Sequence, residues 1–447
     1  MAPILAEIFV AGPAISVTDA MMESPAVVGS PDWTLMAYDL ASTYHNPTET
    51  TITKENAASL EILWRSDMGD NVYGAPLQVG DTIYASTGRV VRAFEAATGE
   101  ELWRNTRAGT TGSLAYENGV LFAHRANSQV VALDANSGDQ QWASSAGPTR
   151  GDGSSSPIVA GDLVFVGGSN GTSEVAGVGG PFRGWISGLD KATGEAMFEF
   201  FTVPQGAAGA SLWSTVAVDL MADVVYGGTG NNHGGMVTDT SDAILAVGIA
   251  EQQLKWKNQR TTGDNWGIGS NAPDADFGAN PVLYTTMVDG VATPMVAAGQ
   301  KSGAVHGLKR ADGAEVWTRS LCSGTRDGSG GIFTNGAWSG KHMLFACNGE
   351  TTKLFGVDGA SGEVLFEKPL PGRVWGRIST IPGVGFVGAG KELVIFDSDT
   401  GEQLKSVSGE GGSVTGTITV AHGRVAYGEG MGWSSAAPGS TLTVLAL

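Results

Sequence analysis

Side chains suited to redox and metal chemistry are few in this chain of 447 residues, which holds two cysteines and six histidines. The cysteines, Cys322 and Cys347, belong to no Cys-x-x-Cys-His pattern for covalent haem and to no Cys-x-x-Cys pair for zinc or redox work. Two interpretations of them stay open: one disulfide, or two free structural thiols. Of the histidines, His306 and His342 lie within strand patterns and are expected to be structural.

Composition narrows the possible partners and points to a strand-rich fold. Glycine accounts for 67 residues, which indicates many strands joined by tight turns. The net charge of −19 argues against nucleic acid or an anionic membrane as a partner. No stretch approaches the roughly eighteen apolar residues of a membrane span. The chain is therefore expected to work in water.

The N-terminal 30 residues differ from the rest. Residues 8–17 form an apolar run of signal-peptide length, but no Lys or Arg precedes Lys54, so a basic flank is missing. We interpret residues 1–30 as an N-terminal extension of the mature protein and residues 31–447 as a single domain.

The stretch from Val130 to Trp142 shows the unit from which that domain is built. Alternating apolar residues predict a strand, Asp134 to Gly138 predicts a reversal, and an aromatic residue follows four positions after the glycine. The same position recurs along the chain, with spacings of 39, 39, 56, 58, 61, 49 and 39 residues, at Trp64, Trp103, Trp142, Phe198, Trp256, Trp317, Phe366 and Lys405. A strand-rich repeat of about forty residues is typical of a β-propeller with four strands per blade.

Eight repeats predict an all-β, eight-bladed propeller. After Lys405 there is room for only three strands, expected at 414–420, 424–427 and 441–445. The fourth strand of the last blade is predicted at 60–66, where it would close the ring and remove an exposed sheet edge. The longest repeats fall between about 150 and 350, so loops there should form the functional face.

The Ala-x-Asp-x-x-Thr-Gly-x-x-x-Trp pattern resembles the tryptophan-docking repeat of quinoprotein alcohol dehydrogenases. The resemblance is closest to their polyvinyl-alcohol dehydrogenase branch, through WTLMAYDLASTYHNPTE near the N-terminus and through GDNW, DADFGANPVLY and GQKSGAVHGL. It implies an eight-bladed propeller that holds pyrroloquinoline quinone (PQQ) and calcium on its axis. Scaffold propellers share the repeat, so the site needs separate support.

Four positions match residues that bind the cofactors in that family. Trp213 matches the ring beneath the quinone, and Lys301 matches the basic residue that hydrogen-bonds the quinone oxygens. Asn231 and Glu174 match oxygen ligands of the calcium ion. Each has a plainer alternative: a packing tryptophan, a surface lysine, a turn asparagine and a solvated glutamate. His233 would lie beside this site, although such a histidine is more often a solvated loop residue.

The match fails at the catalytic aspartate. Gly267 stands where characterised relatives carry the Asp that binds the metal and accepts the alcohol proton, and Gly269 removes the acidic ligand of lanthanide-dependent relatives. Of the nearby carboxylates, which also include Asp264 and Asp274, Asp276 is our candidate replacement as base and metal ligand. A structural, turn-capping Asp276 is the alternative.

The resemblance therefore implies a PQQ- and calcium-dependent dehydrogenase that oxidises a primary or secondary alcohol, small or polymeric, in the axial pocket. Asp276 and Lys301 would be its catalytic residues. Because no haem motif is present, electrons would leave to a separate acceptor such as a cytochrome c. A periplasmic or extracellular location is expected. Two rivals remain: a propeller that lost the chemistry and serves as a binding scaffold, and an enzyme that needs no cofactor.

Overall fold

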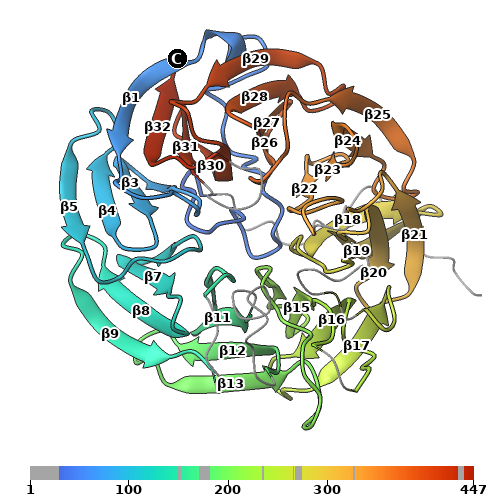
Figure 1. The fold of residues 1–447 in the computed structure, drawn as a ribbon. Helices are drawn as coiled ribbons and strands as arrows, with labels where there is room; N and C mark the ends of the chain where they lie inside the picture. Colours follow the sequence, from blue (N-terminus) through green and yellow to red (C-terminus); the bar gives the residue numbers. More distant parts are fainter. Residues whose placement is uncertain are drawn as a thin grey trace, which may run out of the picture.

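The computed structural model describes residues 30–147, 153–170, 182–233, 236–264, 266, 274–325, 328–430 and 437–447. In these residues 32 strands form separate four-stranded antiparallel sheets, arranged as eight blades around a common axis (Figure 1). The prediction of an all-β, eight-bladed propeller is thus confirmed. The described residues contain one short 3-10 helix, Ala57–Ser59, and no helical segment with the length and apolar character to cross a bilayer.

Seven blades are built from four consecutive strands, counted from the axis outward. Blade 1 comprises β2 (Leu77–Val79), β3 (Thr82–Ser86), β4 (Val91–Glu95) and β5 (Glu101–Asn105). Blade 2 comprises β6 (Ala115–Glu117), β7 (Val120–His124), β8 (Gln129–Asp134) and β9 (Gln140–Ser145). Blade 3 comprises β10 (Ile158–Ala160), β11 (Leu163–Gly168), β12 (Trp185–Asp190) and β13 (Ala196–Phe201). Blade 4 comprises β14 (Ala217–Asp219), β15 (Val224–Gly228), β16 (Ala243–Gly248) and β17 (Leu254–Gln259). Blade 5 comprises β18 (Val282–Val288), β19 (Val291–Gly299), β20 (Ala304–Lys309) and β21 (Glu315–Ser320). Blade 6 comprises β22 (Ala337–Trp338), β23 (Met343–Asn348), β24 (Thr352–Val357) and β25 (Val364–Pro369). Blade 7 comprises β26 (Ser379–Ile381), β27 (Val384–Ala389), β28 (Glu392–Asp397) and β29 (Gln403–Ser408).

Blade 8 joins the two ends of the described chain. It contains β30 (Val414–Ala421), β31 (Arg424–Glu429), β32 (Thr441–Ala446) and, outermost, β1 (Glu61–Asp67). The β1 strand pairs antiparallel with β32, with Arg65 opposite Thr443, as the sequence predicted. Figure 1 shows this closure where the blue strand β1 lies beside the red strand β32. The closure pairs the outer side of β32 with β1, so that β32 is not left as an unpaired edge.

The repeated glycine and tryptophan dock one blade onto the next. Trp64 in blade 8 lies against Gly99 of blade 1, where an added Cβ would come within 2.6 Å of the indole ring. Gly99 has φ +74°, which favours glycine on its own account. The Trp64 Nε1 donates a hydrogen bond of 2.9 Å to the carbonyl of Ala96 in the same turn. Because the aromatic packing and the hydrogen bond recur around the propeller, this repeat fixes the spacing of the blades.

Two repeats that lack the pattern dock by other contacts. Gln252 stands where the turn of blade 4 would have its glycine, at φ +54°. Its side-chain amide donates a hydrogen bond of 2.9 Å to the carbonyl of Met197 and accepts one of 3.3 Å from the N–H of Glu199. These two residues flank Phe198. At the last position, Lys405 Nζ donates to the carbonyls of Leu60 and Ala58 and so fixes the start of β1.

An irregular N-terminal segment, residues 33–49, runs through the middle of the ring (Figure 1, blue) and is called the axial segment below. It contacts the inner part of every blade by a hydrogen bond, and the blades are met largely in chain order. These bonds join Trp33 to Gln78, Thr34 to Tyr116, Met36 to Ser156, Leu40 to Val218, Ala41 to Leu283, Thr43 to Trp338, Tyr44 to Thr380 and Asn46 to Val420. The axial segment therefore ties the innermost strands together beneath the segments that carry the candidate site.

Candidate functional site

The candidate residues gather where the two innermost strands of blades 4 and 5 meet the axis. Trp213 lies in the segment that leads into β14, and Asn231 follows β15 closely. Asp276 lies in the segment that leads into β18, and Lys301 occupies the turn between β19 and β20. Residues that are 88 positions apart in sequence, from 213 to 301, are thus placed side by side by two adjacent blades.

Asp276 is the residue that connects the other three. Its Oδ2 accepts a hydrogen bond of 3.0 Å from Trp213 Nε1, and its Oδ1 accepts one of 2.8 Å from the backbone N–H of Asn231. Its carbonyl accepts a bond of 3.0 Å from the N–H of Lys301. Gly230 allows the close approach, since an added Cβ there would lie 2.9 Å from Asp276 Oδ1. The side chain of Asp276 is 10 % exposed, so the carboxylate can still be reached.

Lys301 places a buried ammonium between carboxylates and aromatic rings. Its Nζ lies 2.8 Å from Asp274 Oδ2 and 3.5 Å from Asp276 Oδ2. The same nitrogen lies 4.9 Å from the ring centroid of Trp213 and 5.7 and 5.6 Å from those of Trp266 and Phe333. A buried ammonium is stable there because it is paired and because ring faces attract cations.

An aromatic wall supports the exposed part of this site. Trp213 is half-buried and packs against Phe333 at 5.7 Å between ring centroids, and Phe333 packs edge-on against Trp375 at 5.4 Å. Gly278 lies against the Trp213 ring, where an added Cβ would come within 2.2 Å. The Nε1 bond to Asp276 and the contact with Gly278 together hold the plane of Trp213 in one orientation.

Burial makes two carboxylates near Asp276 harder to ionise, those of Asp274 and Asp264. Desolvation, reinforced by the charge of Asp276, raises the pKa of Asp274 to about 7, although Lys301 opposes the shift. Burial also raises the pKa of Asp264, whose oxygens accept hydrogen bonds from the N–H groups of Trp266 and Ala275. Asp264 is therefore mainly an organiser of the turn that precedes Asp276.

Asp242 is the most isolated carboxylate of this group. It is fully buried, and neither of its oxygens has a hydrogen-bond partner in the described part of the chain. Desolvation and three neighbouring acidic residues raise its pKa to about 10. At neutral pH Asp242 therefore carries a proton in this environment.

The residues present suit a planar quinone and a cation. The half-buried face of Trp213 suits a flat ring system, and the ammonium of Lys301 lies beside it as a hydrogen-bond donor. Asn231 uses its Nδ2 to bond the carbonyls of Asn232 and Trp266, and no hydrogen bond to its Oδ1 is recorded within the described residues. That oxygen and the Asp276 carboxylate are suitable ligands for a hard cation.

Two sequence candidates cannot be placed. Glu174, the proposed third ligand, and Gly267, the glycine at the expected catalytic position, both lie outside the described residues. Within the described ranges no three His, Cys, Asp or Glu side chains are grouped so as to hold a metal ion. The part of the site that is described therefore offers two adjacent ligand residues, Asn231 and Asp276.

The axial segment supports the site from below. Asn280 lies four residues after Asp276. Its side chain donates a hydrogen bond of 2.7 Å to the hydroxyl of Tyr44 and accepts one of 3.1 Å from the N–H of Thr215. Burial raises the pKa of Tyr44 well above its usual range, so it stays a neutral hydroxyl. This link joins the segments of Trp213 and Asp276 to the centre of the propeller.

The structure also describes the other histidines and the cysteines that the sequence singled out. His233 lies on the Asn231 segment with its ring 6.5 Å from that of Phe182. His306 is buried, which lowers its pKa to about 3, and His342 Nε2 donates 2.7 Å to the carbonyl of Ser398; both fit the structural role expected of them. Cys322 and Cys347 form a disulfide, which resolves the alternative left open by the sequence.

Sequence reasoning missed several members of the site. Asp274 had been named only as a nearby carboxylate, and its pairing with Lys301 was not expected. Asp242, Phe333 and Trp375 had not been singled out at all. The sequence holds only an indirect signal for these residues. Each lies outside the repeated docking position, in a segment that precedes an inner strand or links two of them.

Comparison with known proteins agrees with this architecture. The model of the PQQ_2 family, described as "Outer membrane protein assembly factor BamB", matches residues 48–277 and 301–432. A polyvinylalcohol dehydrogenase from Sphingopyxis sp. (strain 113P3) is 28 % identical over 444 residues, which cover 83 % of this chain and 65 % of that protein. The chain thus spans just under two thirds of that relative's length.

The solved structures support only the fold, because their sequence identity to this chain is low. Quinohemoprotein alcohol dehydrogenase from Comamonas testosteroni superposes with a TM-score of 0.77 at 18 % identity, covering 94 % of this chain and 81 % of that one. BamB from Moraxella catarrhalis gives a TM-score of 0.58 at 16 % identity, covering 87 % of this chain and 98 % of that one.

Proposed function

Since this chain belongs to the PQQ_2 family, we propose that it is a PQQ-dependent dehydrogenase that oxidises a primary or secondary alcohol at the site around Asp276. The observation that carries the proposal is the meeting of a half-buried tryptophan ring, a buried ammonium and a hydrogen-bonded carboxylate where blades 4 and 5 adjoin. Buried ionisable groups with shifted pKa values, such as Asp274, cluster at functional sites, and this favours an enzyme over a scaffold.

Each residue has a part in this reaction. Trp213 binds the flat face of the cofactor, which when bound supplies the acceptor for the two electrons of the alcohol. Lys301 donates hydrogen bonds and positive charge to oxygens that become electron-rich. Asp276 accepts the hydroxyl proton at its carboxylate, held towards the site by Trp213 Nε1 and by the N–H of Asn231.

Calcium is part of the proposal as the cation of this site. Asn231 Oδ1 and Asp276 would hold it, with Glu174 as a further ligand, and its charge would polarise bound oxygens. The substrate is proposed to be a small or polymeric alcohol, because the Sphingopyxis relative is named for polyvinyl alcohol. A separate electron acceptor such as a cytochrome c, and a periplasmic or extracellular location, complete the proposal.

Two measurements test it. PQQ is titrated into the chain with calcium present, and alcohol oxidation is then followed with an artificial electron acceptor. We expect Trp213→Ala to weaken PQQ binding about tenfold, since aromatic stacking contributes on the order of 1 kcal/mol beyond the buried area. The matched variant Trp213→Phe keeps a ring face but not the bond to Asp276, so it should bind better than Trp213→Ala.

The base assignment has its own variant. Asp276→Asn should bind PQQ yet lose most turnover, by about 100-fold or more, because a positioned base contributes 10²–10⁴-fold. Asp289→Asn, at an exposed turn, is the control and should leave turnover unchanged. Full activity of Asp276→Asn would disprove its role as base. Absence of PQQ binding by the parent chain would instead favour the binding scaffold or the enzyme without a cofactor.

A further inference from the structure

The turn that carries Lys301 is held by a neighbouring segment of the chain. This turn, residues 300–303, joins β19 to β20, and the segment that follows β21, residues 321–325 and 328–333, is called the clasp segment below. The clasp segment donates four backbone hydrogen bonds to carbonyls of the turn. Leu321 and Cys322 donate to Gly303 at 2.9 and 3.4 Å, Gly324 donates to Ser302 at 3.1 Å, and Ile332 donates to Gln300 at 3.1 Å. The position of Lys301 therefore depends on the clasp segment.

Glycines show how closely the two segments pack. An added Cβ at Gly331 would lie 1.9 Å from the carbonyl oxygen of Lys301, and one at Gly324 would lie 2.4 Å from it. The clasp segment also carries Phe333, whose ring lies 5.6 Å from Lys301 Nζ and 5.7 Å from the ring of Trp213. The segment thus supports both the backbone and the side-chain surroundings of Lys301.

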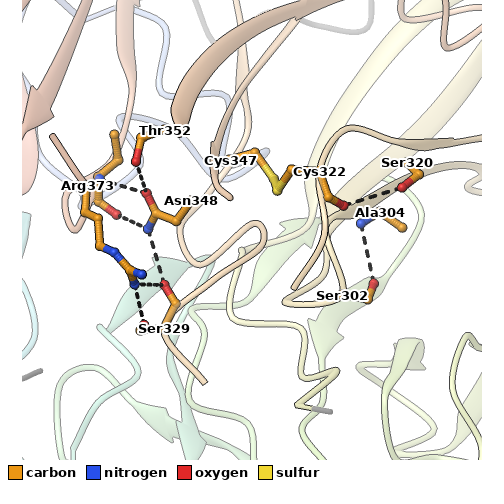
Figure 2. Close-up of a disulfide and its surroundings, with 10 residues drawn as sticks. Ser302, Ala304, Ser320, Cys322, Ser329, Cys347, Asn348, Thr352 and Arg373 are labelled. Atoms are coloured by element: carbon orange, nitrogen blue, oxygen red, sulfur yellow. Dashed lines mark hydrogen bonds between the residues drawn. A yellow bond between two sulfur atoms is a disulfide. The ribbon is translucent and has the colours of Figure 1, made fainter. Parts of the chain in front are cut away.

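Blade 6 anchors the clasp segment at two points, and Figure 2 shows the first of them, the disulfide. Cys322 forms a disulfide with Cys347, and Gly331 exchanges backbone hydrogen bonds of 3.0 and 2.9 Å with Asn348. Cys347 and Asn348 are the last two residues of β23. The Asn348 side chain bonds both backbone groups of Val374 at 2.9 Å, which connects this anchor to the next blade.

We propose that the Cys322–Cys347 disulfide is a positioning element for Lys301, and this inference rests on the proposed PQQ-dependent function. The disulfide holds the clasp segment to β23, the clasp segment holds the turn, and the turn places the ammonium beside Asp274 and Asp276. Lysine needs such support because its side chain is long and has many rotamers. Cys347 is fully buried, so the anchor point itself belongs to the core.

The first test needs no cofactor. Hydrogen–deuterium exchange is measured on the cofactor-free parent and on the double variant Cys322→Ala/Cys347→Ala, for peptides that cover the turn and the clasp segment. We expect exchange there to become at least tenfold faster without the disulfide. Gln252→Ala is the control, because it removes docking bonds in blade 4 and should leave exchange at the Lys301 turn unchanged. Unchanged exchange in the double variant would overturn the proposal.

The second test is a double-mutant cycle on PQQ affinity. Loss of a supporting contact commonly weakens a site by 10- to 100-fold, so the disulfide-free variant should bind PQQ about tenfold more weakly. In the Lys301→Ala background, removing the disulfide should cause little further loss. An equal loss in both backgrounds would show that the disulfide acts independently of Lys301 and would refute the inference. If the parent binds no PQQ, the dehydrogenase proposal fails, and the exchange experiment alone decides whether the disulfide positions Lys301.

Discussion

Replacing Asp242 with Asn should make the stability of this protein less sensitive to pH. Asp242 is fully buried, its oxygens have no hydrogen-bond partner in the described residues, and its pKa in the folded chain is about 10. An unfolded aspartate has a pKa of about 3.9. The folded chain therefore binds this proton more tightly than the unfolded chain does. Its contribution to stability is complete below about pH 3.9 and is lost as the pH rises towards about 10.

The size of the effect follows from this window. One proton changes the free energy of unfolding by ~1.4 kcal/mol per pH unit, so three units between pH 5.5 and 8.5 give at most ~4 kcal/mol. Asp274, whose pKa is raised to about 7, titrates in the same range and interacts with this group. Interacting carboxylates share protons, so we expect roughly 2 kcal/mol. Asparagine is neutral at every pH and also tolerates the φ of +48° at this position.

The assay is urea unfolding at pH 5.5 and 8.5, with a chelator present and without PQQ. The gain in stability of Asp242→Asn over the parent should increase between these two pH values. Asp289→Asn is the matched control, because Asp289 has a similar φ of +50° but lies on the surface. A stability difference between Asp242→Asn and the parent that stays constant or shrinks as the pH rises would refute the reasoning.

Two further predictions concern packing. Gly278→Ala should weaken PQQ binding about tenfold and change the near-ultraviolet circular dichroism, because the new Cβ would lie 2.2 Å from the Trp213 ring; Gly88→Ala, with no atom closer than 3.9 Å, should do neither. Gln252→Ala should lower the free energy of unfolding by about 1–2 kcal/mol, since two hydrogen bonds to β13 are lost. A urea titration that shows no loss relative to the exposed control Gln141→Ala would contradict it.

The fold could be predicted because its main contact is written as a short local pattern. A glycine in a turn and an aromatic residue four positions later specify, in most repeats, both halves of the docking contact between blades. The closure of the ring followed from counting strands. The axial segment could not be predicted in this way. Most of its hydrogen bonds use backbone groups of irregular chain, and each partner is set by the finished propeller.

The site was only partly visible in the sequence, for a physical reason. Trp213, Asn231 and Lys301 could be found because they match family positions, and Asp276 because it lies near the position where the family aspartate is missing. The structure brings the four together. Asp242 could not be identified, because its importance lies in burial and in the absence of a hydrogen-bond partner within the described residues. Neither property is visible in the residue itself. The partner of Cys322 likewise required the distance between two blades.

Gly267 shows how position in sequence differs from position in space. Matching the chain residue by residue puts a glycine where a catalytic carboxylate is expected, which suggested a site without its base. Asp276, nine positions later, reaches Trp213 Nε1, the Asn231 backbone and the Lys301 ammonium from the segment that leads into β18. A base needs hydrogen-bond reach to the substrate, whichever side of a loop supplies it. Glycine at position 267 therefore does not leave the site without a carboxylate, because Asp276 lies at the same group of residues.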